Sequence, residues 1–270
     1  MGMKAHLVQF DIAWEDRHEN FRRVRGLLER ARVERGDLVV LPEMFDTGFS
    51  FNLDRTADRD GATLAFVREL ARELGATVHG GRSVVGPGGR GLNRATIAGP
   101  DGELLVEYDK IHPFSYGKES EFFTGGSRVV TYTWMRAAGS SVAGGDERVT
   151  VCPAVCYDLR FPELFRAGLL AGAEAYALGA NWPASRASHW RALLIARAIE
   201  NQAFVFGVNR CGNDPHLSYA GGSIAVGPKG EVLGELGAEE RVLSVEVDMR
   251  TLREWREVFP AWRDVRLVSK

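Results

Sequence analysis

A single cysteine stands where two kinds of secondary structure meet. Cys156 follows the apolar, β-branched run 149–155, which is typical of a buried strand, and Pro162 opens a helical segment shortly after it. A strand-to-helix corner lifts a side chain out of the sheet and directs backbone N–H groups towards it. Such donors favour a thiolate over a thiol and stabilise an oxyanion formed by attack on a carbonyl. Taken alone, Cys156 is equally compatible with a buried structural thiol.

An acid and a cation occupy comparable strand ends elsewhere in the chain. Glu43 comes just after the apolar segment 38–41, where partial burial would raise the pKa of its carboxyl towards the range of a general base. Lys110 closes the predicted strand 104–109 and can direct its ammonium group into a cleft. By themselves, such residues are more often an ion-paired or capping glutamate and a surface lysine. Combined with a thiol, they meet the needs of amide or nitrile hydrolysis through a thioester, because the thiol attacks, the acid accepts its proton and the cation holds the oxyanion.

The composition excludes several other classes of function. The chain has 270 residues, 45% of them hydrophobic, and its 34 basic and 36 acidic residues give a net charge of −2. The arginines are interleaved with acids, so no concentrated basic patch is available for nucleic acid or an anionic membrane. No apolar run approaches the roughly 18 residues of a membrane helix, and the N-terminal residues are typical of a first strand rather than a signal peptide. Three cysteines are too few for a disulfide framework, so we expect a cytoplasmic protein with reduced thiols.

Strand and helix signals alternate along the whole chain. Apolar residues at helical spacing predict helices over 17–33, 63–74, 162–171 and 187–201. Strands are predicted over 4–10, 37–41, 77–85, 92–98, 104–109, 129–134, 149–155, 175–178, 203–208, 222–226, 232–236 and 241–247, with a hairpin formed by 222–226 and 232–236. We expect a surface loop over Ala137–Gly145 and a polar C-terminal segment after residue 247. Without a repeat or linker, residues 1–270 are expected to form one α/β domain in which helices cover two packed sheets, with the strand order left open.

The motifs around the three polar strand ends resemble those of the nitrilase superfamily of carbon–nitrogen hydrolases, whose catalytic set is Glu, Lys and Cys. The matching segments, in the family's order, are Leu41-Pro42-Glu43, Tyr108-Asp109-Lys110-Ile111-His112 and Cys156-Tyr157-Asp158-Leu159-Arg160-Phe161-Pro162-Glu163. The resemblance implies a four-layer α-β-β-α sandwich, a homodimer formed through helices next to the cysteine, and neither a cofactor nor a metal. It also implies that Glu119 is the second active-site glutamate, orienting Lys110 and the substrate amide, and that the backbone N–H of Tyr157 is an oxyanion donor.

Further segments narrow the resemblance to omega-amidases. They are Leu41–Phe49, Ala180–Arg186, His189-Trp190, Ala196–Gln202 and Phe259–Asp264. Omega-amidases deamidate the open-chain keto acids 2-oxoglutaramate and 2-oxosuccinamate to a dicarboxylate and ammonia. The resemblance therefore implies hydrolysis of a small, carboxylate-bearing amide. An N-carbamoyl amidohydrolase or a nitrilase is the alternative within the superfamily.

A substrate with a distal carboxylate requires a cation, which a bidentate guanidinium supplies best. Arg160 lies four residues after the cysteine, and Arg186 lies in a loop expected at the mouth of the site. For Arg160, a structural ion pair with Glu163 or Glu200 is an equally good explanation. Aromatic pocket walls are expected from Phe45, Phe49 and Trp182.

Other chemistries fit the sequence less well. Cys152 and Cys156 have C-x3-C spacing, but no second Cys/His pair has the spacing of a zinc site. A papain-type protease requires a histidine base, and no histidine has the matching local context. A non-catalytic protein of the same fold would have no need of an intact Glu43, Lys110 and Cys156. We therefore expect an amidase that takes a small-molecule amide as its partner.

Overall fold

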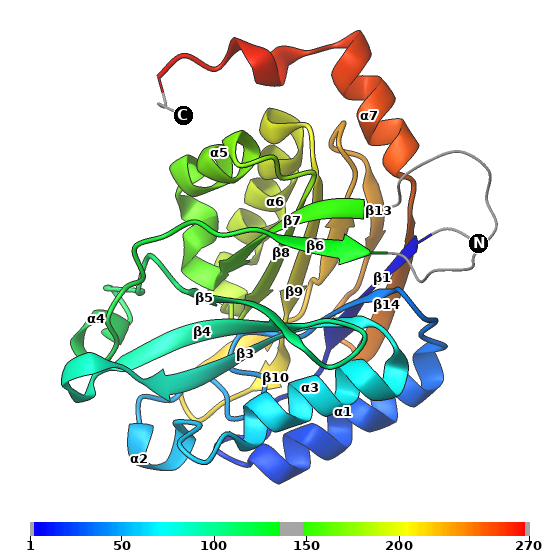
Figure 1. Cartoon of the computed structure of the whole chain (residues 1–270). Helices are drawn as coiled ribbons and strands as arrows, with labels where there is room; N and C mark the ends of the chain where they lie inside the picture. The colour runs from blue at the N-terminus through cyan, green and yellow to red at the C-terminus, as the bar shows by residue number, and fades with distance from the viewer. Residues whose placement is uncertain (1–2, 136–147, 268–270) are drawn as a thin grey trace.

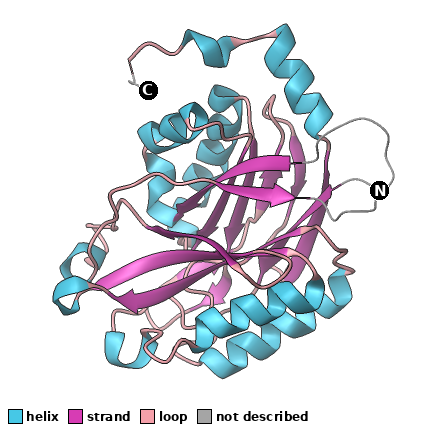
Figure 2. Ribbon diagram, viewed as in Figure 1, coloured by secondary structure: helices cyan, strands magenta, loops and turns pink. Residues whose placement is uncertain are grey.

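The computed structural model describes residues 3–135 and 148–267, so the loop predicted over Ala137–Gly145 lies outside the described residues. Within them, two six-stranded sheets pack face to face between two layers of helices (Figures 1 and 2). This arrangement confirms the predicted α-β-β-α sandwich. In the described ranges no helix is both long and apolar enough to cross a lipid bilayer.

The first sheet has the strand order β14-β1-β2-β3-β4-β5. Its strands are β1 (Met3–Gln9), β2 (Leu38–Val40), β3 (Thr77–Val85), β4 (Gly91–Ala98), β5 (Leu104–Asp109) and β14 (Arg241–Val247). Helices α1 (Arg17–Ala31) and α3 (Ala62–Leu74) connect β1, β2 and β3, which therefore pair in parallel. Short turns join β3, β4 and β5, which pair antiparallel. The two helices cover the outer face because each has an apolar stripe, with Val24 and Leu28 on α1 and Val67 and Leu70 on α3.

The second sheet has the strand order β13-β12-β9-β8-β7-β6. Its strands are β6 (Tyr132–Met135), β7 (Arg148–Val155), β8 (Ala175–Ala180), β9 (Phe204–Asn209), β12 (Ile224–Val226) and β13 (Val232–Glu235). Strands β7, β8 and β9 are parallel, with α5 (Pro162–Leu170) and α6 (Ala187–Asn201) as their connections. The predicted hairpin is confirmed by the antiparallel pairing of β12 and β13. Both faces of β8 are covered, and its six residues are accordingly all buried.

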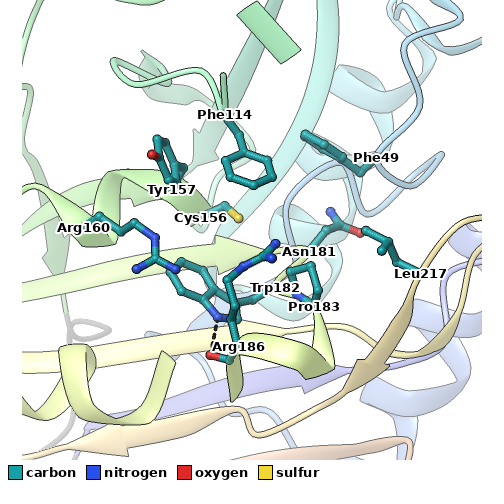
Figure 3. Close-up of a pocket in the computed structure, with 10 residues that line it drawn as sticks. All are labelled: Phe49, Phe114, Cys156, Tyr157, Arg160, Asn181, Trp182, Pro183, Arg186 and Leu217. Carbon is teal, nitrogen blue, oxygen red and sulfur yellow. Dashed lines mark hydrogen bonds between the residues drawn. The ribbon is translucent and has the colours of Figure 1, made fainter. Parts of the chain in front are cut away.

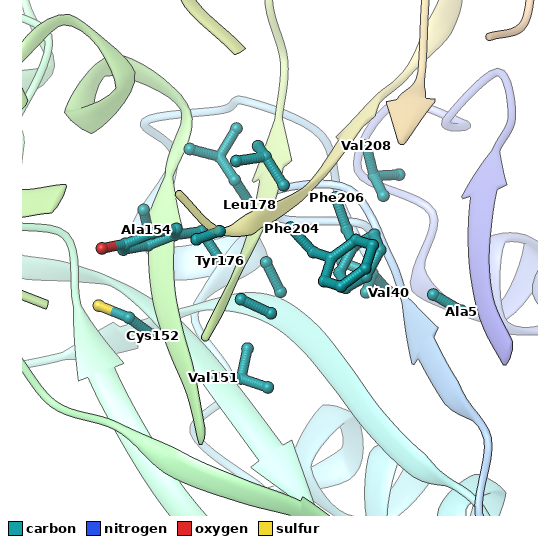
Figure 4. Close-up of a cluster of buried hydrophobic side chains, with 14 of the residues drawn as sticks. Ala5, Val40, Val151, Cys152, Ala154, Tyr176, Leu178, Phe204, Phe206 and Val208 are labelled. Carbon is teal, nitrogen blue, oxygen red and sulfur yellow. The ribbon is translucent and has the colours of Figure 1, made fainter. Parts of the chain in front are cut away.

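The main hydrophobic core fills the space between the two sheets and continues between the second sheet and helices α5 and α6. Figure 4 shows side chains of β1 and β2, such as Ala5 and Val40, together with side chains of β7, β8 and β9. A second core fills the space between the first sheet and helices α1 and α3. Cys152 is fully buried on β7, where its Sγ faces Gly168 of α5. Packing against this covering helix accounts for Cys152 as a structural thiol.

The C-terminal segment differs from its prediction. Residues Met249–Val258 form a helix, α7, that the polar composition did not suggest. Two apolar side chains on one face, Met249 and Leu252, are buried, and the Asp248 side chain caps the first turn by accepting from the N–H of Arg250. The remaining short elements are α2 (Leu53–Thr56), α4 (Glu119–Phe122), β10 (Cys211–Asn213) and β11 (Ser218–Ala220).

Candidate active site

The corner that carries Cys156 is tied to the end of β5. Cys156 is the first residue after β7 and has a left-handed backbone conformation, with φ +44°, before a single 3-10 turn. Asp158 in that turn accepts the Val155 N–H at 3.0 Å and the Tyr108 hydroxyl at 2.7 Å. Its other oxygen accepts the backbone N–H of His112 at 3.0 Å. Asp158 therefore connects the cysteine corner to the segment on which Lys110 lies.

Two glycines let the loop that carries Glu43 lie against both sheets. A Cβ on Gly179 of β8 would lie 2.6 Å from the carbonyl oxygen of Leu41 and 2.8 Å from the Glu43 nitrogen. A Cβ on Gly81 of β3 would lie 2.8 Å from the Met44 nitrogen. Any larger residue at either position would displace the backbone of this loop. The fold thus uses close backbone approach from two sheets to place one carboxylate.

A buried cluster of charged and polar groups lies at these strand ends. The Nζ atom of Lys110 is 2.9 Å from Oε1 of Glu43 and 2.8 Å from Oε2 of Glu119, and all three side chains are at most 1% exposed. The side-chain nitrogen of Asn93 donates to Oε1 of Glu43 at 2.7 Å and to Oε1 of Glu119 at 2.8 Å. The backbone N–H of Asn181 donates to Oε2 of Glu43 at 2.9 Å. The cluster is held almost entirely by charge-assisted hydrogen bonds, which are the strong ones.

Burial and neighbouring charges shift the pKa values of the three charged groups in different directions. Burial raises the pKa of Glu43, but the Lys110 charge and the hydrogen bonds to the carboxylate outweigh it, so the pKa falls below its ordinary value. Burial lowers the pKa of Lys110, but Glu119 and Glu43 more than offset this and keep it an ammonium. Glu119 keeps a raised pKa because burial and the charge of Glu43 exceed the effect of Lys110.

The environment of the Cys156 thiol favours its neutral form. Burial raises its pKa well above the ordinary range, and the charge of Glu43 raises it further, while Lys110 opposes them only in part. The expectation that backbone donors at the corner would favour a thiolate is therefore wrong here, because burial beside two carboxylates dominates. The expectation of a raised pKa for Glu43 is also wrong, because the charge of Lys110 and the hydrogen bonds to the carboxylate lower its pKa by more than burial raises it. A neutral thiol beside an ionised carboxylate is an acid–base pair ready for proton transfer.

Cys156 opens into a pocket of about 380 Å³, counting its open mouth (Figure 3). The lining residues are Phe49, Phe114, Cys156, Tyr157, Arg160, Asn181, Trp182, Pro183, Arg186 and Leu217. The guanidinium of Arg160 lies 4.8 Å from the ring centre of Trp182, and that of Arg186 lies 5.3 Å from the ring centre of Phe114. Within the described parts of the chain neither arginine has a carboxylate partner, so both remain available to an anionic ligand.

Comparison with known proteins identifies the family. The model of the carbon-nitrogen hydrolase family matches residues 4–257. The chain belongs to the carbon–nitrogen hydrolases. A 2-oxoglutaramate amidase of Bacillus subtilis is 34% identical to this hydrolase over 96% of both chains. The omega-amidase YafV of Escherichia coli K12 is also 34% identical, over 97% of this chain and 96% of its own.

Solved structures of the family have the same fold as this hydrolase. XC1258 of Xanthomonas campestris, described as a CN-hydrolase superfamily protein with an arsenic adduct in the active site, superimposes with a TM-score of 0.88. It is 34% identical, and the match covers 100% of this chain and 99% of that chain. Nit3 of Saccharomyces cerevisiae, from branch 10 of the nitrilase superfamily, has a TM-score of 0.82 at 26% identity, covering 96% and 94% of the two chains.

The hydrolase fold brings most of the predicted site residues together, and one of them lies elsewhere. Phe45 was expected in the pocket wall, but it is fully buried in the second core, with its ring centre 5.9 Å from that of Phe66. The left-handed turn at Met44 separates Glu43 from Phe45 and sends the two side chains to different sides of the first sheet. Phe49 and Trp182, the other two predicted wall residues, do line the pocket, and the ring centre of Phe49 is 5.4 Å from the Lys110 ammonium.

Neither of the two acids considered for Arg160, Glu163 and Glu200, pairs with it among the described residues. Glu200 pairs with Arg197 at 2.9 Å, whereas the Arg160 guanidinium lies 3.4 Å from Nδ1 of His189. Among the described residues, no three His, Cys, Asp or Glu side chains are grouped so as to hold a metal ion.

Three polar residues of the site were not singled out from the sequence. Asp158 and Asn181 lie inside segments that carry the family resemblance, so their positions in the sequence could have pointed to them. Asn93 had none, because an asparagine in a predicted strand is indistinguishable from one that faces solvent. Only the pairing of β4 with β3 and β5 shows that its side chain faces the buried carboxylates.

Proposed function

We propose that this hydrolase cleaves the C–N bond of a small primary amide that carries a distal carboxylate, through a thioester on Cys156, and releases ammonia. The observation that carries the proposal is the buried cluster of Glu43, Lys110 and Glu119 beside Cys156, at the inner end of a pocket whose two arginines, Arg160 and Arg186, pair with no carboxylate among the described residues. The relatives named 2-oxoglutaramate amidase and omega-amidase support substrates of the 2-oxoglutaramate or 2-oxosuccinamate type.

The first half of the reaction forms the thioester. The Cys156 sulfur attacks the amide carbon while the Glu43 carboxylate accepts the thiol proton. Negative charge develops on the carbonyl oxygen and is met by the Lys110 ammonium and the backbone N–H of Tyr157. An ammonium has three N–H donors, and Lys110 commits two of them to Glu43 and Glu119, which leaves the third for the oxyanion. When the tetrahedral intermediate collapses, the C–N bond breaks and Glu43 returns the proton to the departing nitrogen, which leaves as ammonia.

The second half of the reaction returns the free enzyme. Glu43, again a carboxylate, takes a proton from water as the water oxygen attacks the thioester carbonyl. The same donors hold the second oxyanion, the C–S bond breaks, and the Cys156 sulfur leaves with the proton that Glu43 held. Glu119 positions Lys110 through both steps and is available to accept an N–H of the substrate amide. No electron transfer is required at any stage.

The pocket supplies the means to recognise the rest of the substrate. Arg160 and Arg186 offer guanidinium groups to a distal carboxylate, and Trp182 forms a flat wall beneath Arg160. A cytoplasmic location and a homodimer remain predictions from the sequence and the family.

Ammonia release across a matched panel of compounds tests the proposal. The panel contains 2-oxoglutaramate, 2-oxosuccinamate, glutamine, an N-carbamoyl amino acid and an aliphatic nitrile, with Cys156→Ala as the inactive control. We expect the two keto-acid amides to be hydrolysed with the highest kcat/KM, and a thioester on Cys156 to be detected by mass spectrometry of the quenched enzyme. Release of carbon dioxide from the N-carbamoyl compound, or turnover of the nitrile, at a higher kcat/KM would refute the proposed substrate class. Full activity of Cys156→Ala would refute the nucleophile.

A further inference from the structure

One buried asparagine joins the two carboxylates of the site. Asn93 of β4 is 2% exposed, and its side-chain nitrogen donates to Oε1 of Glu43 at 2.7 Å and to Oε1 of Glu119 at 2.8 Å. Its backbone carbonyl also accepts the N–H of Lys110 at 2.8 Å. Asn93 thus contacts all three charged residues of the cluster, although it contributes no charge itself.

The hydrogen bonds divide the two oxygens of Glu43 into different kinds of acceptor. Oε1 accepts from both Lys110 and Asn93, which uses the two in-plane lone pairs of a carboxylate oxygen. Oε2 accepts the backbone N–H of Asn181 at 2.9 Å, with the Asn181 side chain only at 3.4 Å. The second hydrogen bond to Oε2 is thus long and weak, so Oε2 is the oxygen better able to accept a proton.

The orientation of the Asn93 carboxamide is dictated by its neighbours. Its oxygen, Oδ1, is buried and has no hydrogen-bond partner in the described part of the molecule. Rotating the group by half a turn would set that oxygen against two carboxylates. The site accepts one unsatisfied acceptor in order to direct both N–H donors at Glu43 and Glu119.

We propose that Asn93 is a positioning residue that saturates Oε1 of Glu43, so that the Cys156 proton is transferred to Oε2, and that holds both glutamates as carboxylates. The role deepens the proposed function and rests on it, since it assumes that Glu43 is the base. Without Asn93, Glu43 loses one charge-assisted donor to Oε1. Oε1 then competes with Oε2 for the Cys156 proton. A carboxylate that loses a donor becomes a stronger base and is protonated at a higher pH.

Three variants separate this role from simple packing. Asn93→Leu keeps the branching and the number of side-chain heavy atoms and removes the donors, whereas Asn93→Asp keeps the shape and adds a third carboxylate. Ser83→Ala is the matched control, because Ser83 lies opposite Asn93 on β3, is fully buried, and has a hydroxyl without a hydrogen-bond partner in the described residues. We expect Asn93→Leu to lower kcat by roughly 10- to 100-fold with little change in KM, the loss that follows from one hydrogen bond to a charged group. Asn93→Asp should lose more at neutral pH, and Ser83→Ala should match the parent.

The pH dependence is the decisive measurement. The acid limb of kcat/KM should move to higher pH by about one unit in Asn93→Leu, as expected for a loss of that size. The same shift should appear in the rate at which iodoacetamide alkylates Cys156, followed by mass spectrometry. In that reaction the Cys156 sulfur displaces iodide while Glu43 takes the thiol proton. The Glu43→Gln variant shows how the alkylation rate depends on pH when this base is absent.

Alkylation needs no substrate, so it tests Asn93 even if every amide in the panel proves inert. An inert panel with a shifted alkylation profile would refute the proposed substrate and leave Asn93 in its role. Equal loss of kcat at every pH, with an unshifted alkylation profile in a folded Asn93→Leu protein, would overturn the inference. If Asn93→Leu does not fold, the isosteric Asn93→Asp must show a displaced alkylation profile, and an unchanged one overturns it equally.

Discussion

Removing either arginine at the pocket mouth should change substrate preference rather than the chemical step. A hydrogen bond between a guanidinium and a carboxylate contributes about 1.5–3 kcal/mol, and the lower end applies because Arg160 and Arg186 are partly exposed. This corresponds to a loss of roughly tenfold in kcat/KM for each replacement by alanine, and roughly a hundredfold for both if they act independently. A neutral amide of the same chain length has no carboxylate to lose, so its kcat/KM should change little.

The assay compares 2-oxoglutaramate with an uncharged aliphatic amide for each variant. Arg160→Lys and Arg186→Lys keep the charge and lose the bidentate geometry, so they should fall between the parent and the alanine variants. Arg191→Ala is the control, because Arg191 is an exposed arginine of α6 that is paired with Glu235. High salt should weaken the parent's preference for the carboxylate substrate and leave the double alanine variant unaffected.

Equal losses on the two substrates would contradict this reasoning. Such a result would mean that Arg160 supports the packing of Trp182, over which its guanidinium lies, and that the carboxylate is bound elsewhere. A loss confined to Arg186→Ala would assign the carboxylate to that residue alone. Activity of Arg191→Ala that falls with the others would show that the effect is one of general surface charge.

The remaining predictions concern stability and the placement of the base. Lys110→Met should abolish turnover. It should also lower the free energy of unfolding in urea by about 3–5 kcal/mol at neutral pH, because two buried carboxylates are left without their cation. An unchanged unfolding midpoint would contradict the buried ion pairs. Gly179→Ala should leave a folded protein with kcat reduced at least tenfold, because its Cβ would displace the Glu43 loop, and parental kcat would show that the loop tolerates the shift. Burial lowers the pKa of His79 to about 4 from an ordinary 6.5, so the unfolded chain binds a proton at a higher pH than the folded chain does. The free energy of unfolding is therefore highest above pH 6.5 and falls by roughly 3 kcal/mol as the pH drops towards 4. His79→Leu should therefore flatten the dependence of unfolding free energy on pH in that range, and an unchanged slope would exclude His79 as its cause.

The sequence predicted those parts of the molecule that depend on local pattern. Strand β3 and helix α6 have the predicted bounds, because apolar periodicity and flanking turn residues act over short distances. The two packed sheets covered by helices followed from the mixture of hairpins and strand–helix units, and the family resemblance added the four-layer order. The three strand-end residues followed from their types and positions. Helix α7 was missed because only two of its residues, Met249 and Leu252, are buried.

What the sequence could not predict depends on distances between segments far apart in the chain. Whether Glu43 has a raised or a lowered pKa is decided by its contacts with Asn93, Lys110 and Asn181, which lie 50, 67 and 138 positions away. Whether Phe45 joins Phe49 in the pocket wall depends on the backbone at Met44, a left-handed residue next to Phe45. Periodicity carries no information on either point.

The charge state of the resting site explains why its base and its nucleophile are coupled. A thiol with a strongly raised pKa supplies almost no thiolate, so attack on the amide must coincide with proton transfer to Glu43. That transfer requires Glu43 to be ionised beforehand, which a carboxylate in a dry cavity achieves only if it is given donors. Lys110, Asn93 and Asn181 are those donors, and they come from the ends of β4, β5 and β8. The two packed sheets are therefore needed for the chemistry itself, because neither sheet alone brings the thiol and the donors of its base together.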